Sequence, residues 1–175
     1  MTDAKNALHD LTEHPGQDFA RYQDAHTIQT LIHTARTIAI VGLSPSVLRA
    51  SNFVGYYLQR HGYHIVPVNP KEQTILGETA YPSLSAVPVH VDIVDVFRAP
   101  AAVPAIAEEA VKIGAGALWL QFDVISPEGA AIAERGGLKV VMDRCLKVEH
   151  ARYMGRMHWM GFNTGNISAL RDAND

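Results

Sequence analysis

Short apolar runs alternate with longer amphipathic stretches along most of this chain. The apolar runs cover about residues 37–41, 64–68, 91–97, 117–121 and 138–142. Before the first run, Ile28, Leu31 and Ile32 follow the spacing of a helix that should begin near Asp24. Strand-length apolar runs that alternate with helices are typical of parallel sheets with both faces covered. The pattern predicts an α/β fold in which five strands form a Rossmann-like, doubly wound parallel sheet with flanking helices.

Capping residues define the helices between these runs. Ser51 is expected to be the N-cap of a helix over about 51–61, which Gly62 ends. Pro100 should open a second helix that ends before Gly114, and Ser126 should cap a third that ends at 136–137. The connection after residue 68 is expected to be irregular, apart from a short turn or helix at 81–83.

The chain is expected to form one domain with two appended segments. Residues 1–23 are polar and predict an N-terminal arm, loose or docked on the surface. Residues 24–150 hold the alternating pattern and predict the domain itself, which is long enough to bury a proper core. Residues 151–175 predict a C-terminal extension, whose glycine-rich stretch Gly161–Asn166 should pack back on the domain.

Composition and charge exclude several classes of protein. A hydrophobic content of 47% and a charged content of 19% are typical of globular proteins. With a net charge of −3 and no basic tract, we expect no binding to nucleic acid or to a membrane surface. One cysteine excludes an internal disulfide framework, and the polar N-terminus lacks the apolar core of a secretory signal. We therefore expect a cytoplasmic protein.

The first candidate for chemistry is the loop over residues 42–51. It follows a buried strand, begins with Gly42 and leads into a helix, which is the layout of a mononucleotide-binding βαβ unit. Free N–H groups at the helix start can receive phosphate, with support from Ser44, Ser51 and Arg49. The dinucleotide pattern G-x-G-x-x-G is absent, since the next glycine is Gly55. A plain structural turn therefore remains an alternative.

The end of the second apolar run indicates which nucleotide such a site would prefer. NAD sites usually have an acidic residue near this point, which holds the ribose 2′-hydroxyl. Here the run ends in Asn69, Pro70 and Lys71 instead. A lysine in this place favours a ligand with an additional phosphate.

Seven segments in the region of about 38–152, roughly two thirds of the chain, occur together in a characteristic order and spacing. They are Val41–Pro45, Arg49–Ser51, Pro67–Pro70, Leu76–Glu78, Tyr81–Leu84, Val91–Arg98 and Val141–Cys145. With these segments the chain resembles the stand-alone CoA-binding proteins of the YccU-like type. That family is related to the N-terminal CoA-binding domain of the succinyl-CoA synthetase α subunit.

The resemblance implies that coenzyme A, free or as an acyl-CoA, lies along the carboxyl edge of the sheet. Its ADP part would be held by the Gly42 loop and the second strand, with a 3′-phosphate near Lys71. The contacts that the resemblance implies are Gly42, Leu43, Ser44, Arg49, Ser51, Asn69, Pro70, Lys71, Phe97, Arg98 and Gln121. Lys71 and Arg98 could also be solvated surface charges, and Phe97 an ordinary core residue. Asp123 departs from the family, which often has a small residue there.

Cys145 supports two interpretations. As the only cysteine, at the end of the last apolar run, it could be a small buried hydrophobic residue. It could also be a thiol that meets the CoA sulfur, with its pKa lowered by Arg144. His150 and His158 lack a convergent set of partners, so no metal site is predicted.

Three hypotheses about function remain at this point. The first is a protein that binds CoA or an acyl-CoA without chemistry of its own, since the related ligases place their other substrate sites in further domains. The second is a small NADP-dependent oxidoreductase, although no Ser-Tyr-Lys or His-Asp arrangement follows the fourth run. The third is a redox protein that forms a disulfide between Cys145 and CoA. No catalytic residue is assigned, and the sequence names no protein partner.

Overall fold

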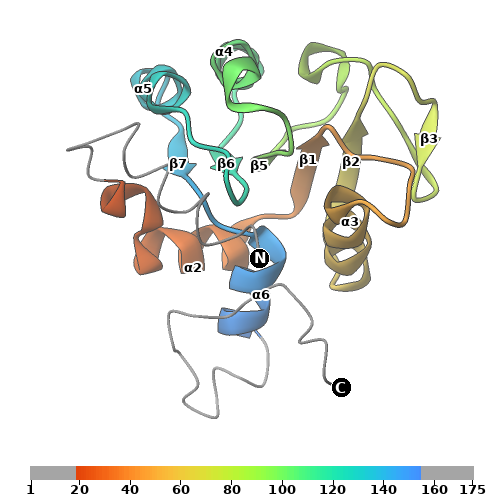
Figure 1. Cartoon of the computed structure of the whole chain (residues 1–175), viewed down its shortest axis with the longest axis horizontal. Helices are drawn as coiled ribbons and strands as arrows, with labels where there is room; N and C mark the ends of the chain where they lie inside the picture. The colour runs from red at the N-terminus through yellow and green to blue at the C-terminus, as the bar shows by residue number, and fades with distance from the viewer. Residues whose placement is uncertain (1–18, 155–175) are drawn as a thin grey trace, which may run out of the picture.

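A five-stranded parallel sheet with helices on both faces forms the domain (Figure 1). The computed structural model describes residues 19–154. The strand order is β2-β1-β5-β6-β7. The strands are β1 (Thr37–Val41), β2 (His64–Val68), β5 (Ile93–Val96), β6 (Ala117–Leu120) and β7 (Lys139–Val141). The predicted α/β fold is thus confirmed, and each strand begins within two residues of its predicted start.

The helices divide between the two faces of the sheet (Figure 1). One face carries α2 (Ala25–Thr34), α3 (Ala50–Arg60) and α6 (Leu146–Met154), and the other carries α4 (Val103–Lys112) and α5 (Pro127–Arg135). Alternate residues of each strand supply the two cores, because successive side chains point to opposite faces. In β1, Ile38 and Ile40 pack on the first face, and Ala39 and Val41 on the second. None of the described helices is long and apolar enough to span a bilayer.

The helix ends follow the capping residues in two cases and differ in one. Asp24 caps α2 by accepting a hydrogen bond from Thr27 N at 2.8 Å, and Ser126 caps α5 at Gly129 N. Ser51 is not the N-cap of α3, because the helix begins one residue earlier and Arg49 occupies the N-cap position. The Ser51 hydroxyl instead accepts from Ser44 N at 3.1 Å, within the preceding loop.

Two further elements were not predicted. The connection after β2 was expected to be irregular, but it contains a small hairpin of β3 (Thr74–Ile75) and β4 (Glu78–Thr79). The hairpin turns at Leu76 and Gly77, which both have positive φ, as the type I′ form of a two-residue hairpin turn requires. Strands of two residues are too short to show an alternating pattern. The second element is α6.

Short 3₁₀ turns complete the described chain. They are η1 (Ala20–Gln23), η2 (Leu84–Ala86) and η3 (Pro100–Ala102). The end of the expected N-terminal arm packs on the sheet, since Tyr22 is buried and its carbonyl accepts from Met142 N at 3.1 Å. Residues 1–18 and most of the expected C-terminal extension, with Gly161–Asn166 and His158, lie outside the described residues.

An acidic residue lies inside the core at the centre of the sheet. Asp95 in β5 is fully buried, and its Oδ1 accepts a hydrogen bond from Gln121 Nε2 at 2.7 Å. Its Oδ2 has no hydrogen-bond partner among residues 19–154. Burial raises the pKa of Asp95 from its ordinary 3.8 to about 7, against the opposing effect of the Gln121 hydrogen bond.

The buried Asp95 should make stability depend on pH. Because the folded protein holds this proton more tightly than the unfolded chain, the stabilisation is complete below pH about 3.8 and is lost as pH rises through about 7. We expect this residue to lower the free energy of unfolding by roughly 2–3 kcal/mol between pH 5 and pH 8. Urea unfolding of the wild type and of Asp95→Asn at both pH values measures it. Equal pH dependence in the two proteins would contradict the assignment.

Candidate ligand-binding site

The strand register brings four candidate residues to one edge of the sheet. Val41 pairs with both Val68 and Val96, and Val96 pairs with Leu120. The residues that directly follow these strand ends are Gly42, Asn69, Phe97 and Gln121. The chain leaves β1 toward β2 and later returns to β5 on the other side of β1. This is a topological switch point, the usual place for ligands in open α/β sheets.

Gly42 allows the loop after β1 to pass directly against the end of β5. Its φ is +87°, and a Cβ atom there would lie 2.9 Å from both the Phe97 carbonyl oxygen and Arg98 Cδ. Any side chain would therefore meet backbone atoms that cannot move aside. The close approach places the loop after β1 beside Phe97 and Arg98.

Serine and asparagine side chains then hold the loop between Gly42 and α3. Ser44 Oγ accepts from Ser46 N at 3.1 Å, and Ser46 Oγ accepts from Leu48 N at 3.4 Å. Asn52 Nδ2 donates to the Ser44 carbonyl at 2.9 Å. These bonds join the loop to the first turn of α3, where the N–H groups of Ala50 and Ser51 have no partner among the described residues. Such free N–H groups can receive an anion.

Asn69 connects the second strand to the same loop. Its Nδ2 donates to the Leu43 carbonyl at 3.0 Å, and its Oδ1 accepts from Lys71 N at 2.9 Å. The side chain therefore fixes both the Gly42 loop and the backbone at Lys71. Leu43 itself is fully buried in the core beneath the loop.

A polar cavity of about 520 Å³ opens at this edge. Nine of the eleven predicted contacts line it: Gly42, Ser44, Arg49, Ser51, Asn69, Pro70, Lys71, Phe97 and Arg98. Arg49, Lys71 and Arg98 are exposed cations, and no described carboxylate pairs with any of them. No acidic side chain appears among the described lining residues. Three unpaired cations beside a helix N-terminus make this cavity suitable for phosphate groups.

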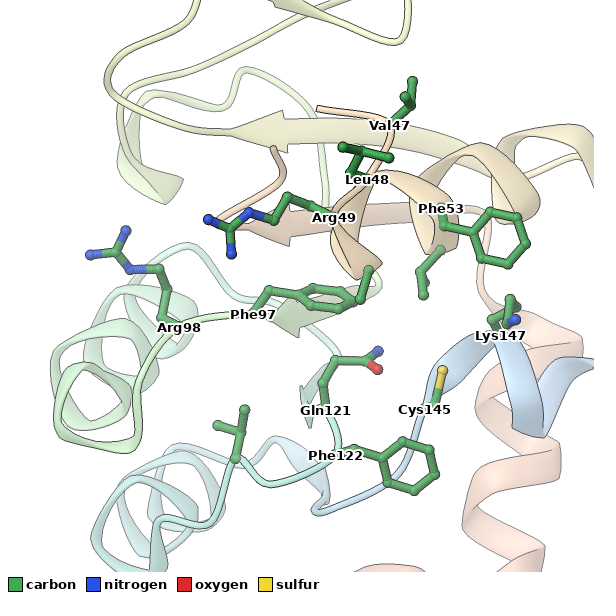
Figure 2. A pocket seen from close by; sticks show the side chains of 13 residues that line it. Val47, Leu48, Arg49, Phe53, Phe97, Arg98, Gln121, Phe122, Cys145 and Lys147 are labelled. Carbon is green, nitrogen blue, oxygen red and sulfur yellow. The ribbon is translucent and has the colours of Figure 1, made fainter. Parts of the chain in front are cut away.

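A second, mostly apolar cavity of about 700 Å³ continues from the first. The two share Arg49, Ala50, Phe97 and Arg98. Gln121, the tenth predicted contact, lines this second cavity, and Leu43 lines neither. Figure 2 shows Arg49 and Arg98 at one end of it and Phe53, Phe122, Cys145 and Lys147 at the other.

The sequence did not point to the apolar lining. Val47, Leu48, Phe53 and Phe122 belong to loops or to the exposed side of a helix, where an apolar residue has no periodic pattern. The one feature of the sequence that could have indicated this lining is the presence of large apolar residues in the loops after the first and fourth predicted strands. Lys147, whose ammonium lies 4.4 Å from the centroid of the Phe53 ring, comes from the unpredicted helix α6.

Cys145 is buried at the floor of the apolar cavity. Burial raises the pKa of its thiol, and the nearby Asp95 adds to the effect. The alternative interpretation, a thiol whose pKa is lowered by Arg144, is therefore wrong. Arg144 is used elsewhere: its Nη2 donates to Gln23 Oε1 at 2.8 Å, and its Nε lies 3.8 Å from the buried Glu149. The interpretation of Cys145 as a buried residue is confirmed.

Two other residues from the sequence analysis lie away from the cavities. Asp123 lines neither cavity, and its N–H donates to Asp143 Oδ1 at 2.9 Å. His150, in α6, packs against α3, where its Nδ1 lies 3.0 Å from the Tyr57 hydroxyl. Burial lowers the pKa of His150 to about 4, so the ring is neutral at pH 7.

Comparison with known proteins identifies a family model and several relatives that this chain resembles. A family model described as "CoA binding domain" matches residues 36–151. The Bacillus subtilis protein YneT, described as uncharacterized, is 37% identical over 124 residues, which are 71% of this chain and 92% of YneT. An ADP-forming acetate–CoA ligase of Archaeoglobus fulgidus is 31% identical over 121 residues, which are 63% of this chain and only 18% of the ligase.

Solved structures agree with the sequence matches. A hypothetical protein from Pyrococcus horikoshii is 36% identical and superposes with a TM-score of 0.74, covering 75% of this chain and 93% of its own. The family model covers most of the described residues 19–154. This chain belongs to the family of CoA binding domains.

Proposed function

We propose that this protein binds coenzyme A across the two connected cavities. The main support for this proposal is the difference between the linings of the two cavities. Three unpaired cations line the polar cavity, and mostly hydrocarbon side chains line the far end of the apolar one. CoA has the same asymmetry, with a highly charged nucleotide joined to an uncharged pantetheine arm. The ADP part would occupy the polar cavity and the arm would extend into the apolar one.

The charged residues can be assigned to the phosphates of CoA. Arg49 and Arg98 line both cavities, which suits the pyrophosphate where nucleotide and arm meet. The first turn of α3 supports that position through the free N–H groups of Ala50 and Ser51. Lys71, beyond the end of β2, is then the partner for the 3′-phosphate on the ribose.

In this proposal Gln121 recognises the pantetheine arm. Its Nε2 donates to Asp95, so the carbonyl oxygen is the acceptor that the Gln121 side chain can offer to a ligand in the apolar cavity. Such an oxygen can accept a hydrogen bond from an amide N–H of the arm. In this assignment Asp95 is a positioning residue and makes no contact with the ligand.

The role of Lys71 predicts a ranking of ligands. CoA should bind more tightly than dephospho-CoA, which lacks the 3′-phosphate, and NAD should bind poorly because no acidic residue holds its ribose hydroxyl. Calorimetric titration with the three compounds measures the ranking. Equal affinity for CoA and dephospho-CoA would exclude the 3′-phosphate contact.

Arg49→Ala should weaken CoA binding about tenfold or more, since a hydrogen bond between charged groups contributes roughly 1.5–3 kcal/mol. Folding should change little, because the Arg49 side chain is exposed and caps α3 only through its backbone. The matched control is Arg135→Ala, an exposed arginine in the last turn of α5, at the opposite edge of the sheet. A dissociation constant unchanged by Arg49→Ala would make Arg49 a solvated side chain.

Cys145→Ser should leave the affinity for CoA within about threefold of the wild type, a difference of under ~0.7 kcal/mol. A buried thiol with a raised pKa is protonated at pH 7 and is a poor nucleophile. Titration of the variant checks the affinity, and the intact mass of non-reduced wild type checks for attached CoA. A mass increase that matches CoA and disappears in the variant would contradict this prediction.

A further inference from the structure

We propose that the far end of the apolar cavity holds the acyl chain of an acyl-CoA, and that an uncharged aliphatic chain is preferred. This inference rests on the proposed CoA site and names the form of CoA that fits it. The cavity continues beyond the two arginines that would hold the pyrophosphate, toward Phe53, Phe122 and Cys145 (Figure 2). A chain attached to the CoA sulfur would continue in that direction.

Exposed apolar side chains gather around this cavity. The exposed fractions are 79% for Val47, 91% for Leu48, 56% for Phe53 and 41% for Phe122. They come from the loop after β1, from α3 and from the loop after β6, and all four line the same cavity. Single exposed apolar residues are normal, but a contiguous group from three elements marks a binding surface.

The pantetheine arm alone does not account for this lining. The arm carries two amides and a hydroxyl, which require polar partners when they are buried. Gln121 and the two arginines provide such partners near the shared end. At the far end the lining offers aromatic and aliphatic surface instead, which matches a hydrocarbon chain.

The only described charge at the far end is directed at an aromatic ring. The Lys147 ammonium lies over the Phe53 ring, 4.4 Å from its centroid, in a cation–π contact. The methylene groups of a lysine add to apolar surface while its charge stays at the edge. A neutral chain packs on this apolar lining at no cost, whereas the carboxylate of a charged acyl group would lose its hydration there, and the Lys147 ammonium already contacts the Phe53 ring.

Calorimetric titration of the full chain with CoA, acetyl-CoA, octanoyl-CoA and succinyl-CoA tests the inference. Octanoyl-CoA should bind at least about tenfold more tightly than acetyl-CoA, because more methylene groups are buried. Succinyl-CoA should gain nothing over acetyl-CoA. Phe122→Ser should lower the ratio of octanoyl-CoA affinity to acetyl-CoA affinity by at least about threefold, and Phe122→Leu should leave this ratio unchanged.

Val89→Ser is the matched control, since Val89 is 44% exposed and does not line the cavity. If Phe122→Ser does not fold, Phe53→Ser on the exposed side of α3 replaces it. Equal affinity for acetyl- and octanoyl-CoA would overturn the inference while leaving CoA binding intact. A succinyl-CoA preference would also overturn it. If none of the four compounds binds, the proposed function itself fails.

Discussion

The backbone of Gly42 lies so close to the end of β5 that no side chain fits between them. A Cβ atom there would lie 2.9 Å from the Phe97 carbonyl oxygen, and the φ of +87° itself favours glycine. This contact determines the path of the loop after β1. The serine hydrogen bonds continue that path into α3, and Asn69 joins it to the end of β2. Both cavities lie along this single path.

The polar cavity has a positive charge because no acidic residue appears among its described lining residues. The chain as a whole has a net charge of −3, yet Arg49, Lys71 and Arg98 line one cavity with no acidic residue among its described lining. Like charges held together in the free protein repel each other, and a bound polyanion would relieve that repulsion. The acidic Asp95 is close in the fold but buried beneath Gln121. Burial raises its pKa, which limits the negative charge it adds at neutral pH.

The sequence was sufficient for the sheet and for most of the polar cavity. Strand ends could be predicted from apolar runs, so Gly42 and Asn69 were assigned from the residues themselves, whereas Phe97 was included because of the family resemblance. The apolar cavity could not be predicted, because exposed residues such as Leu48 and Phe122 meet only after the loops fold. Helix α6 was missed, and with it Lys147. Ser51 resembled an N-cap, but its hydroxyl binds Ser44 N and Arg49 takes that position.

One ligand should occupy both cavities, with its phosphates at Arg49 and Arg98. A crystal structure of the protein with CoA tests this most directly. The adenosine diphosphate should lie between the Gly42 loop and Lys71, and the pantetheine arm should pass Phe97 toward Gln121. CoA bound away from this edge, or with its nucleotide in the apolar cavity, would contradict the proposed binding mode.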